Sequence, residues 1–156
     1  MSDAPRRSPE ELVSGLRETQ EELPQLVRAL PAERLAAGPA DGGWSAREVL
    51  AHLADFELMA GVRVRTVVTL DRPALATYDQ EACTARFGAL ESVEEALERW
   101  LVNRRANVRL LAALGPADWQ RAGVHHERGE EPLARTVAML LRHDRAHLEQ
   151  MREAAS

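Results

Sequence analysis

The residues best suited to chemistry in this sequence are histidines. His143 and His147 lie four positions apart, in the run His-Asp-Arg-Ala-His. On a helix, side chains at this spacing project from one face a turn apart, so both imidazoles could bind the same ion. The glutamate base of the His-Glu-x-x-His helices of zinc proteases is missing here. Histidine pairs at this spacing also arise by chance, so the pair alone leaves a structural role open.

A third histidine, His52, lies at the border of the apolar stripe of a separate helical segment. His143 and His147 lie at the border of the stripe in their own segment. A ligand at such a border is held by the core, yet it stays within reach of a substrate. Three neutral imidazoles would leave a divalent ion with its full charge and an open position. Imidazole suits several metals, and we expect Zn or Ni, with Fe or Mn as alternatives.

Four long segments with helical periodicity must position these histidines. The sequence predicts helices over about residues 8–30, 45–70, 92–115 and 132–153. The second and third begin at capping boxes opened by serines, and the third ends before a Gly-Pro pair. Each segment carries one apolar stripe, which is the pattern of an all-α fold of the four-helix-bundle type. We expect one domain over residues 1–156.

The levels of the histidines along the helices select a topology. His52 lies about 10 Å from the start of the second helix, and the other two lie about 9 to 15 Å from the end of the fourth. The three meet if these helices run antiparallel, whereas a simple up-down-up-down bundle makes them parallel. The long connection over residues 73–91 could cross the bundle between helices 2 and 3 and so permit an up-down-down-up order.

The same crossover could cover the mouth of the site. Loops of this length in compact domains are usually functional or disordered. We expect Tyr78 or Phe87 to pack near the site and shape a substrate pocket. The alternative is an inert crossover whose aromatic residues seal the core. Cys83 in this segment is either a reactive thiol or a half-buried apolar side chain.

Further polar residues have both a functional and a structural interpretation. Asp144 points at the centre of the apolar stripe of its helix, so it needs a partner. It could orient a ligand histidine or pair with an arginine of a neighbouring helix, and we favour pairing. Asp55 and Glu57 could assist the site, but a solvated surface position is the expected one. His125 and His126 are expected in a polar connection.

Composition excludes several classes of function. The net charge is −5, and acidic and basic residues are interspersed, so no basic patch for nucleic acid is expected. No stretch reaches the roughly 20 apolar residues of a membrane span, and the start of the chain lacks the apolar region of a secretion signal. The lone cysteine suits a reducing compartment, so we expect a cytoplasmic protein.

Three segments resemble the DinB/YfiT-like family of metalloenzymes. They are residues 44–55 (WSAREVLAHLAD), 78–81 (YDQE) and 143–150 (HDRAHLEQ). The likeness covers nearly the whole chain in the right order. It implies an up-down-down-up four-helix bundle and a metal held by His52, His143 and His147. The family includes transferases and isomerases that depend on a thiol cofactor.

Together these observations predict a metal-dependent enzyme for a small-molecule substrate. The ion would activate water or a low-molecular-weight thiol for hydrolysis, transfer or isomerisation. The alternative is a metal-binding or stress-response module without catalysis. We also expect a homodimer, because three tryptophans and long apolar stripes provide anchors for an interface.

Overall fold

Four long helices form the body of the molecule. The computed structural model describes residues 7–38 and 42–155. Its elements in chain order are α1 (Pro9–Ala29), α2 (Ala32–Ala36), α3 (Ala46–Thr69), α4 (Gln80–Phe87), α5 (Val93–Ala113), α6 (Pro116–Trp119), β1 (Ala122–His125), β2 (Gly129–Pro132) and α7 (Leu133–Ala155). The four long helices lie within two residues of the predicted ranges.

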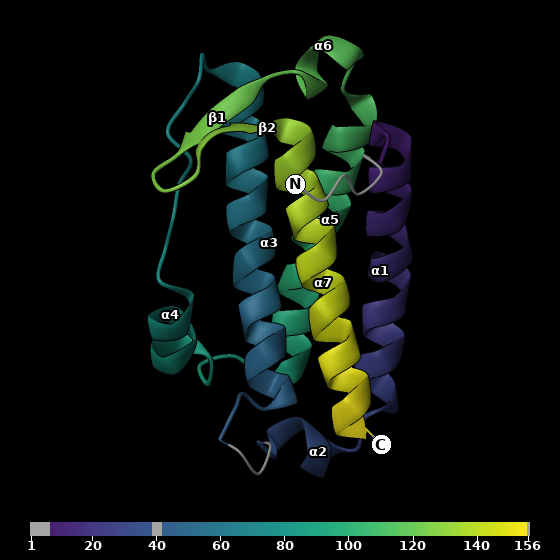
Figure 1. Ribbon diagram of the computed structural model, residues 1–156. Helices are drawn as coiled ribbons and strands as arrows, with labels where there is room; N and C mark the ends of the chain where they lie inside the picture. Colours follow the sequence, from purple (N-terminus) through teal and green to yellow (C-terminus); the bar gives the residue numbers. More distant parts are fainter. Residues whose placement is uncertain (1–6, 39–41, 156) are drawn as a thin grey trace.

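The bundle has the predicted up-down-down-up order. Figure 1 shows α1 and α7 running in one direction and α3 and α5 running in the other. α3 packs against α5 and α7, and α1 packs against the same two helices. α3 and α7 are therefore adjacent and antiparallel, as the levels of the histidines require.

Local sequence signals determine where these helices begin. α1, α3 and α5 each start at a serine whose side chain accepts a bond from the backbone of the third helical residue. In each case the glutamate at that third position binds back to the backbone N–H of the serine, which completes a capping box. These reciprocal bonds satisfy backbone N–H groups that would otherwise lack partners.

The core is divided into two apolar halves by a polar layer. One half joins residues such as Leu16, Val64 and Leu141, and the other joins residues such as Leu50, Trp100 and Leu148. Between them each long helix contributes at least one buried polar residue, and Thr19, Glu57, Arg104 and Asp144 come from the four helices in turn. Bundle cores are normally apolar, so this layer needs its own physical account.

The connections contain structure that the sequence did not predict. β1 and β2 form an antiparallel hairpin in which Ala122 faces Pro132 and His125 faces Gly129. The crossover pairs with this hairpin through a parallel bridge between Ala74 and Val124. The prediction of a polar connection for His125 and His126 was therefore incomplete, because His125 ends a strand.

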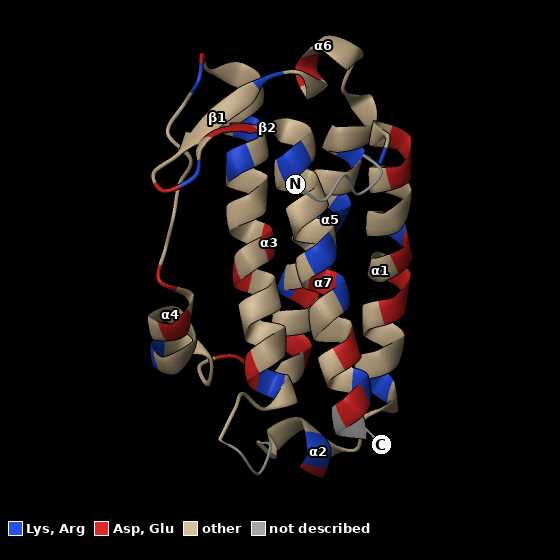
Figure 2. Ribbon diagram, viewed as in Figure 1, with Lys and Arg blue, Asp and Glu red and all other residues tan. Residues whose placement is uncertain are grey.

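Charged residues of both signs are distributed over the helices. In the view of Figure 2, basic positions are interspersed with acidic ones along α7, whereas most charged positions of α1 are acidic. The visible part of these two helices therefore carries no extended basic region. No helix in the described part of the chain is long and apolar enough to span a membrane.

Candidate metal centre

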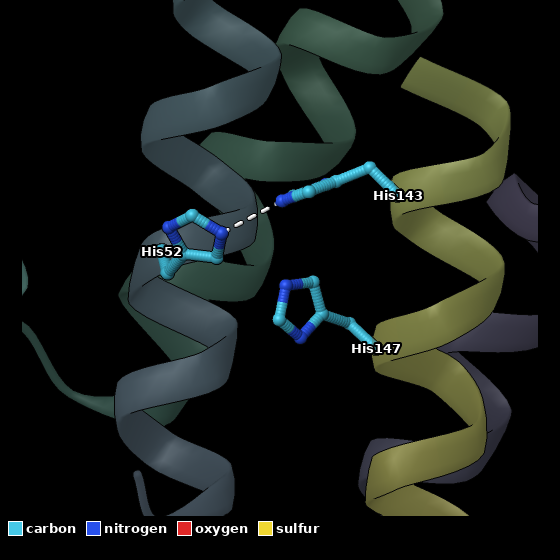
Figure 3. A group of neighbouring side chains, drawn as sticks. All are labelled: His52, His143 and His147. Atoms are coloured by element: carbon cyan, nitrogen blue, oxygen red, sulfur yellow. Dashed lines mark hydrogen bonds between the residues drawn. The ribbon is translucent and has the colours of Figure 1, made fainter. Parts of the chain in front are cut away.

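The structure brings the three predicted histidines together. His52 projects from α3 toward His143 and His147 of α7 (Figure 3). Nε2 of His52 lies 2.7 Å from Nε2 of His143. One ring nitrogen from each histidine lies within 4.8 Å of the others. The antiparallel packing of α3 and α7 produces this cluster, since it places residues near the start of one helix beside residues near the end of the other.

The cluster lies between the core and the solvent. His52 is 2% exposed, whereas the other two histidines are half-buried. The ring of Phe56 stacks on that of His143, with 3.8 Å between centroids and 15° between planes. Trp44 lies on another side, 4.8 Å from His52 between ring centroids. The aromatic residues thus cover His52 and one face of His143, and the half-buried His143 and His147 form the more exposed part of the cluster.

Burial favours the neutral form of His52 and His147. Burial first, and then the neighbouring His143 and His147, lower the pKa of His52 to about 3. Burial and then His143 also lower the pKa of His147, although a hydrogen bond to Gln150 acts in the opposite direction. A neutral imidazole has a free lone pair, so these two rings are in the form that binds metal near neutral pH.

The donor set fits a divalent transition metal. Nδ1 of His147 lies 2.9 Å from Oε1 of Gln150, and the ring turns its other nitrogen toward the cluster. Nδ1 of His52 and Nδ1 of His143 are buried without a hydrogen-bond partner among the described residues. Two nitrogens on one tetrahedral zinc ion lie about 3.3 Å apart. The separation of 2.7 Å between His52 and His143 would need to open only slightly.

The carboxylates near the cluster are already paired. Asp144 is buried and forms an ion pair with Arg104 of α5, which confirms the pairing favoured from its position in the sequence. Glu57 is completely buried and pairs with the same arginine at 2.7 Å, so its predicted surface position was wrong. Asp55 is half-buried and pairs with Arg99 at 2.8 Å.

A signal for this pairing was present in the sequence. Glu57 falls on the stripe of Leu53 and Val64, and Arg104 falls on the stripe of its own helix. A charged residue on an apolar stripe needs a buried partner.

The crossover reaches the neighbourhood of the histidines through Tyr78. Together with Phe56 and Met139, Tyr78 lines a cavity of about 20 Å³ between α3 and α7. The Tyr78 hydroxyl is buried without a hydrogen-bond partner among the described residues. Phe87, in contrast, is 50% exposed. Of the two aromatic residues proposed for a pocket, Tyr78 is therefore the one next to Phe56, the ring that stacks on His143.

The remaining candidates do not join the cluster. The Cys83 thiol donates to Oδ2 of Asp55 at 3.3 Å. Burial and this carboxylate raise the pKa of Cys83, which disfavours a reactive thiolate. His125 accepts backbone bonds from the hairpin turn at Nδ1 and stacks on His126.

The family is decided by comparison with known proteins. The model of the DinB superfamily matches residues 15–151. The chain belongs to the DinB superfamily. A relative from Oceanobacillus iheyensis, provisionally named metal-dependent hydrolase OB0782, is 27% identical over 139 residues, covering 82% of this chain and 77% of its own length. This membership confirms the resemblance seen in the sequence.

Two solved structures of similar shape show how far the superfamily fold extends. YfiT from Bacillus subtilis, a four-helix bundle of unusual topology provisionally described as a metal-dependent hydrolase, matches with a TM-score of 0.88 at 22% identity. That match covers 99% of this chain and 91% of YfiT. A mycothiol-dependent maleylpyruvate isomerase matches with a TM-score of 0.73 at 14% identity, over 93% of this chain and 61% of the isomerase. At these identities the two structures establish a shared fold.

Proposed function

We propose that the protein is a cytoplasmic metal-dependent enzyme that acts on a small organic molecule. His52, His143 and His147 would hold one divalent ion, Zn or Ni in the first place and Fe or Mn as alternatives. The observation that carries the proposal is the cluster of three imidazoles, with a ring nitrogen of each within 4.8 Å of the others, at the border of the core. The names of the relatives support a metal-dependent reaction.

The residues of the chain prepare this site for an exchangeable ligand. When bound, a divalent ion on three neutral ligands lowers the pKa of a water or thiol at its open position. His52 anchors the site in the core, and the half-buried His143 and His147 form its accessible side. Phe56 and Trp44 exclude water from the rings that they cover. We propose hydrolysis, transfer or isomerisation as the class of reaction, with a low-molecular-weight thiol as a candidate cosubstrate.

Elemental analysis of protein purified without an affinity tag tests the metal site. We expect close to one ion per chain in the wild type, and its loss after replacement of any one of the three histidines by Ala. His126→Ala is the matched control, because that side chain is exposed and lies on the hairpin. Equal metal content in the wild type and in the triple variant would contradict the assignment.

A second candidate is a metal-binding module without catalysis. It is favoured by the arginine pairing of Asp55, Glu57 and Asp144, which leaves none of these three carboxylates as a ready general base. A panel of hydrolysis and thiol-transfer substrates separates the two functions. Turnover that disappears with His147→Ala supports the enzyme. A metal-loaded protein inactive on the whole panel supports the module.

We also propose that two copies form a homodimer through the face opposite the histidines. A groove of about 570 Å³ lies along α1, α2 and α5 and is lined by apolar residues such as Leu97, Leu101 and the largely exposed Val102. Arg28 and Glu94 also line it, so the surface carries both signs and could pair with itself. Sedimentation should give twice the chain mass of 17.3 kDa, and Val102→Glu should give the monomer. A monomeric wild type at micromolar concentration would contradict this.

A further inference from the structure

A fully buried ionic cluster lies across the middle of the bundle, next to the histidines. It joins Arg104 of α5 to Glu57 of α3 and Asp144 of α7. Nε and Nη2 of Arg104 donate to the two oxygens of Glu57, at 3.0 and 2.7 Å. Nη2 also donates to Oδ2 of Asp144. From Nη1 the guanidinium donates to Thr19 of α1 at 2.7 Å, so this one side chain connects all four long helices.

The charges of this cluster do not balance. The guanidinium of Arg104 faces two carboxylates, those of Glu57 and Asp144. Among the described residues, the arginine that pairs with each carboxylate is Arg104. Asn107 donates to Glu57 at 2.8 Å and accepts from Arg65, but Arg65 is exposed to water. A buried charge without compensation is costly. A purely structural pair would need one carboxylate, so the second requires another reason.

Asp144 is oriented toward a histidine of the cluster. Its Oδ2 is taken by Arg104, and its Oδ1 lies 3.9 Å from Nδ1 of His143. That ring nitrogen is buried and has no hydrogen-bond partner among the described residues. The other nitrogen of the same ring, Nε2, faces His52. Asp144 therefore faces the nitrogen of His143 that the histidine cluster does not use.

We propose that Asp144, held in place by Arg104, is a positioning residue that accepts a hydrogen bond from Nδ1 of His143 and supplies negative charge to the ion at the three histidines. This inference rests on the proposed metal site. An imidazole bound to metal usually donates its second N–H to a carboxylate or carbonyl, which fixes the orientation of the ring. Nδ1 of His143 and Oδ1 of Asp144 are 3.9 Å apart, which is too long for a hydrogen bond. A shift of about 1 Å in either side chain would form the bond.

The charge balance explains why the cluster contains two carboxylates. Three neutral imidazoles leave both positive charges of a divalent ion uncompensated. Glu57 neutralises Arg104 through two hydrogen bonds, so the charge of Asp144 remains available to the ion. Arg104 thus fixes the position of Asp144 without cancelling the net charge of the cluster.

Two isosteric variants test this assignment. Asp144→Asn and Glu57→Gln each remove one buried negative charge and leave Arg104 with one carboxylate, but only Asp144 faces His143. Competition of each protein with a chromophoric chelator for Zn²⁺ and Ni²⁺ gives the metal affinity. We expect Asp144→Asn to bind about 10- to 100-fold more weakly than the wild type. Glu57→Gln should weaken binding less than Asp144→Asn does, because it removes the same buried charge but keeps the carboxylate that faces Nδ1 of His143.

A measurement on the wild type keeps the inference testable if Asp144→Asn fails to fold. In the Zn²⁺-loaded wild type, the Nδ1 proton of His143 should give a downfield NMR signal that exchanges slowly with water. This inference is wrong, although the metal site stands, if the signal is missing from the metal-loaded wild type. The same holds if Asp144→Asn binds metal as tightly as the wild type or as Glu57→Gln. If the wild type binds neither Zn²⁺ nor Ni²⁺, the proposed metal site is wrong as well.

Discussion

Replacing Arg104 by Met would remove the cation between two buried carboxylates. Met retains much of the apolar volume beside Trp100, whose ring lies 4.5 Å from the guanidinium carbon. Glu57 and Asp144 would then share the centre of the bundle without a positive charge. Burial raises the cost of ionising both groups, and their mutual repulsion adds to that cost.

The contacts of Arg104 set the size of the effect. Removing one partner of a buried ion pair typically costs about 3 to 5 kcal/mol, and this variant strands two carboxylates. It also removes the hydrogen bond to Thr19 and a weaker one to the carbonyl of Leu16, at 2.7 and 3.3 Å. The free energy of unfolding should therefore fall by at least about 5 kcal/mol, a large part of the stability of a domain of this size.

Urea denaturation followed by far-UV circular dichroism measures this loss. Arg109→Met on the same helix is the matched control, because Arg109 is exposed and its replacement should change stability by less than about 0.5 kcal/mol. If Arg104→Met does not fold, Thr19→Val gives a milder test. It removes one acceptor of the guanidinium and should cost about 1.5 to 3 kcal/mol. A loss below about 1.5 kcal/mol for Arg104→Met would refute the reasoning, since only a solvated arginine could be removed at that cost.

Three further predictions concern the histidines and the crossover. The pKa of His52 is about 3 in the folded protein, below the ordinary value of 6.5. Protonation of this ring therefore favours the unfolded chain, so the contribution of His52 to stability is complete above pH 6.5 and is lost as the pH falls toward about 3. Metal-free protein should therefore lose about 2 kcal/mol between pH 7 and 5, and His52→Ala should show a smaller loss; equal losses would contradict this. A Cβ at Gly123 would overlap the crossover, so Gly123→Ala should speed proteolysis within residues 71–79 at unchanged helix content. Tyr78→Phe removes a buried hydroxyl without a described partner, so it should weaken substrate affinity at little cost in melting temperature, while Phe87→Ala should change neither.

The sequence alone determined the long helices, and it predicted the histidine cluster for one order of those helices. Capping boxes and apolar stripes are local signals, which is why the long helices were predicted to within two residues. The spacing of His143 and His147 places them on one face whatever surrounds the helix. His52 joins them only in an antiparallel arrangement of α3 and α7, and the length of the crossover already permitted that arrangement.

Tertiary structure decided the polar contacts between elements. Periodicity shows that Glu57, Arg104 and Asp144 lie on apolar stripes, but their pairing depends on the rotation and axial level of three separate helices. The hairpin and its bridge to the crossover depend likewise on backbone partners distant in the sequence. Local patterns specify which face of an element is buried. The partner that a buried charge meets is specified only when the helices have packed, because a shift of one turn would bring a different side chain to it.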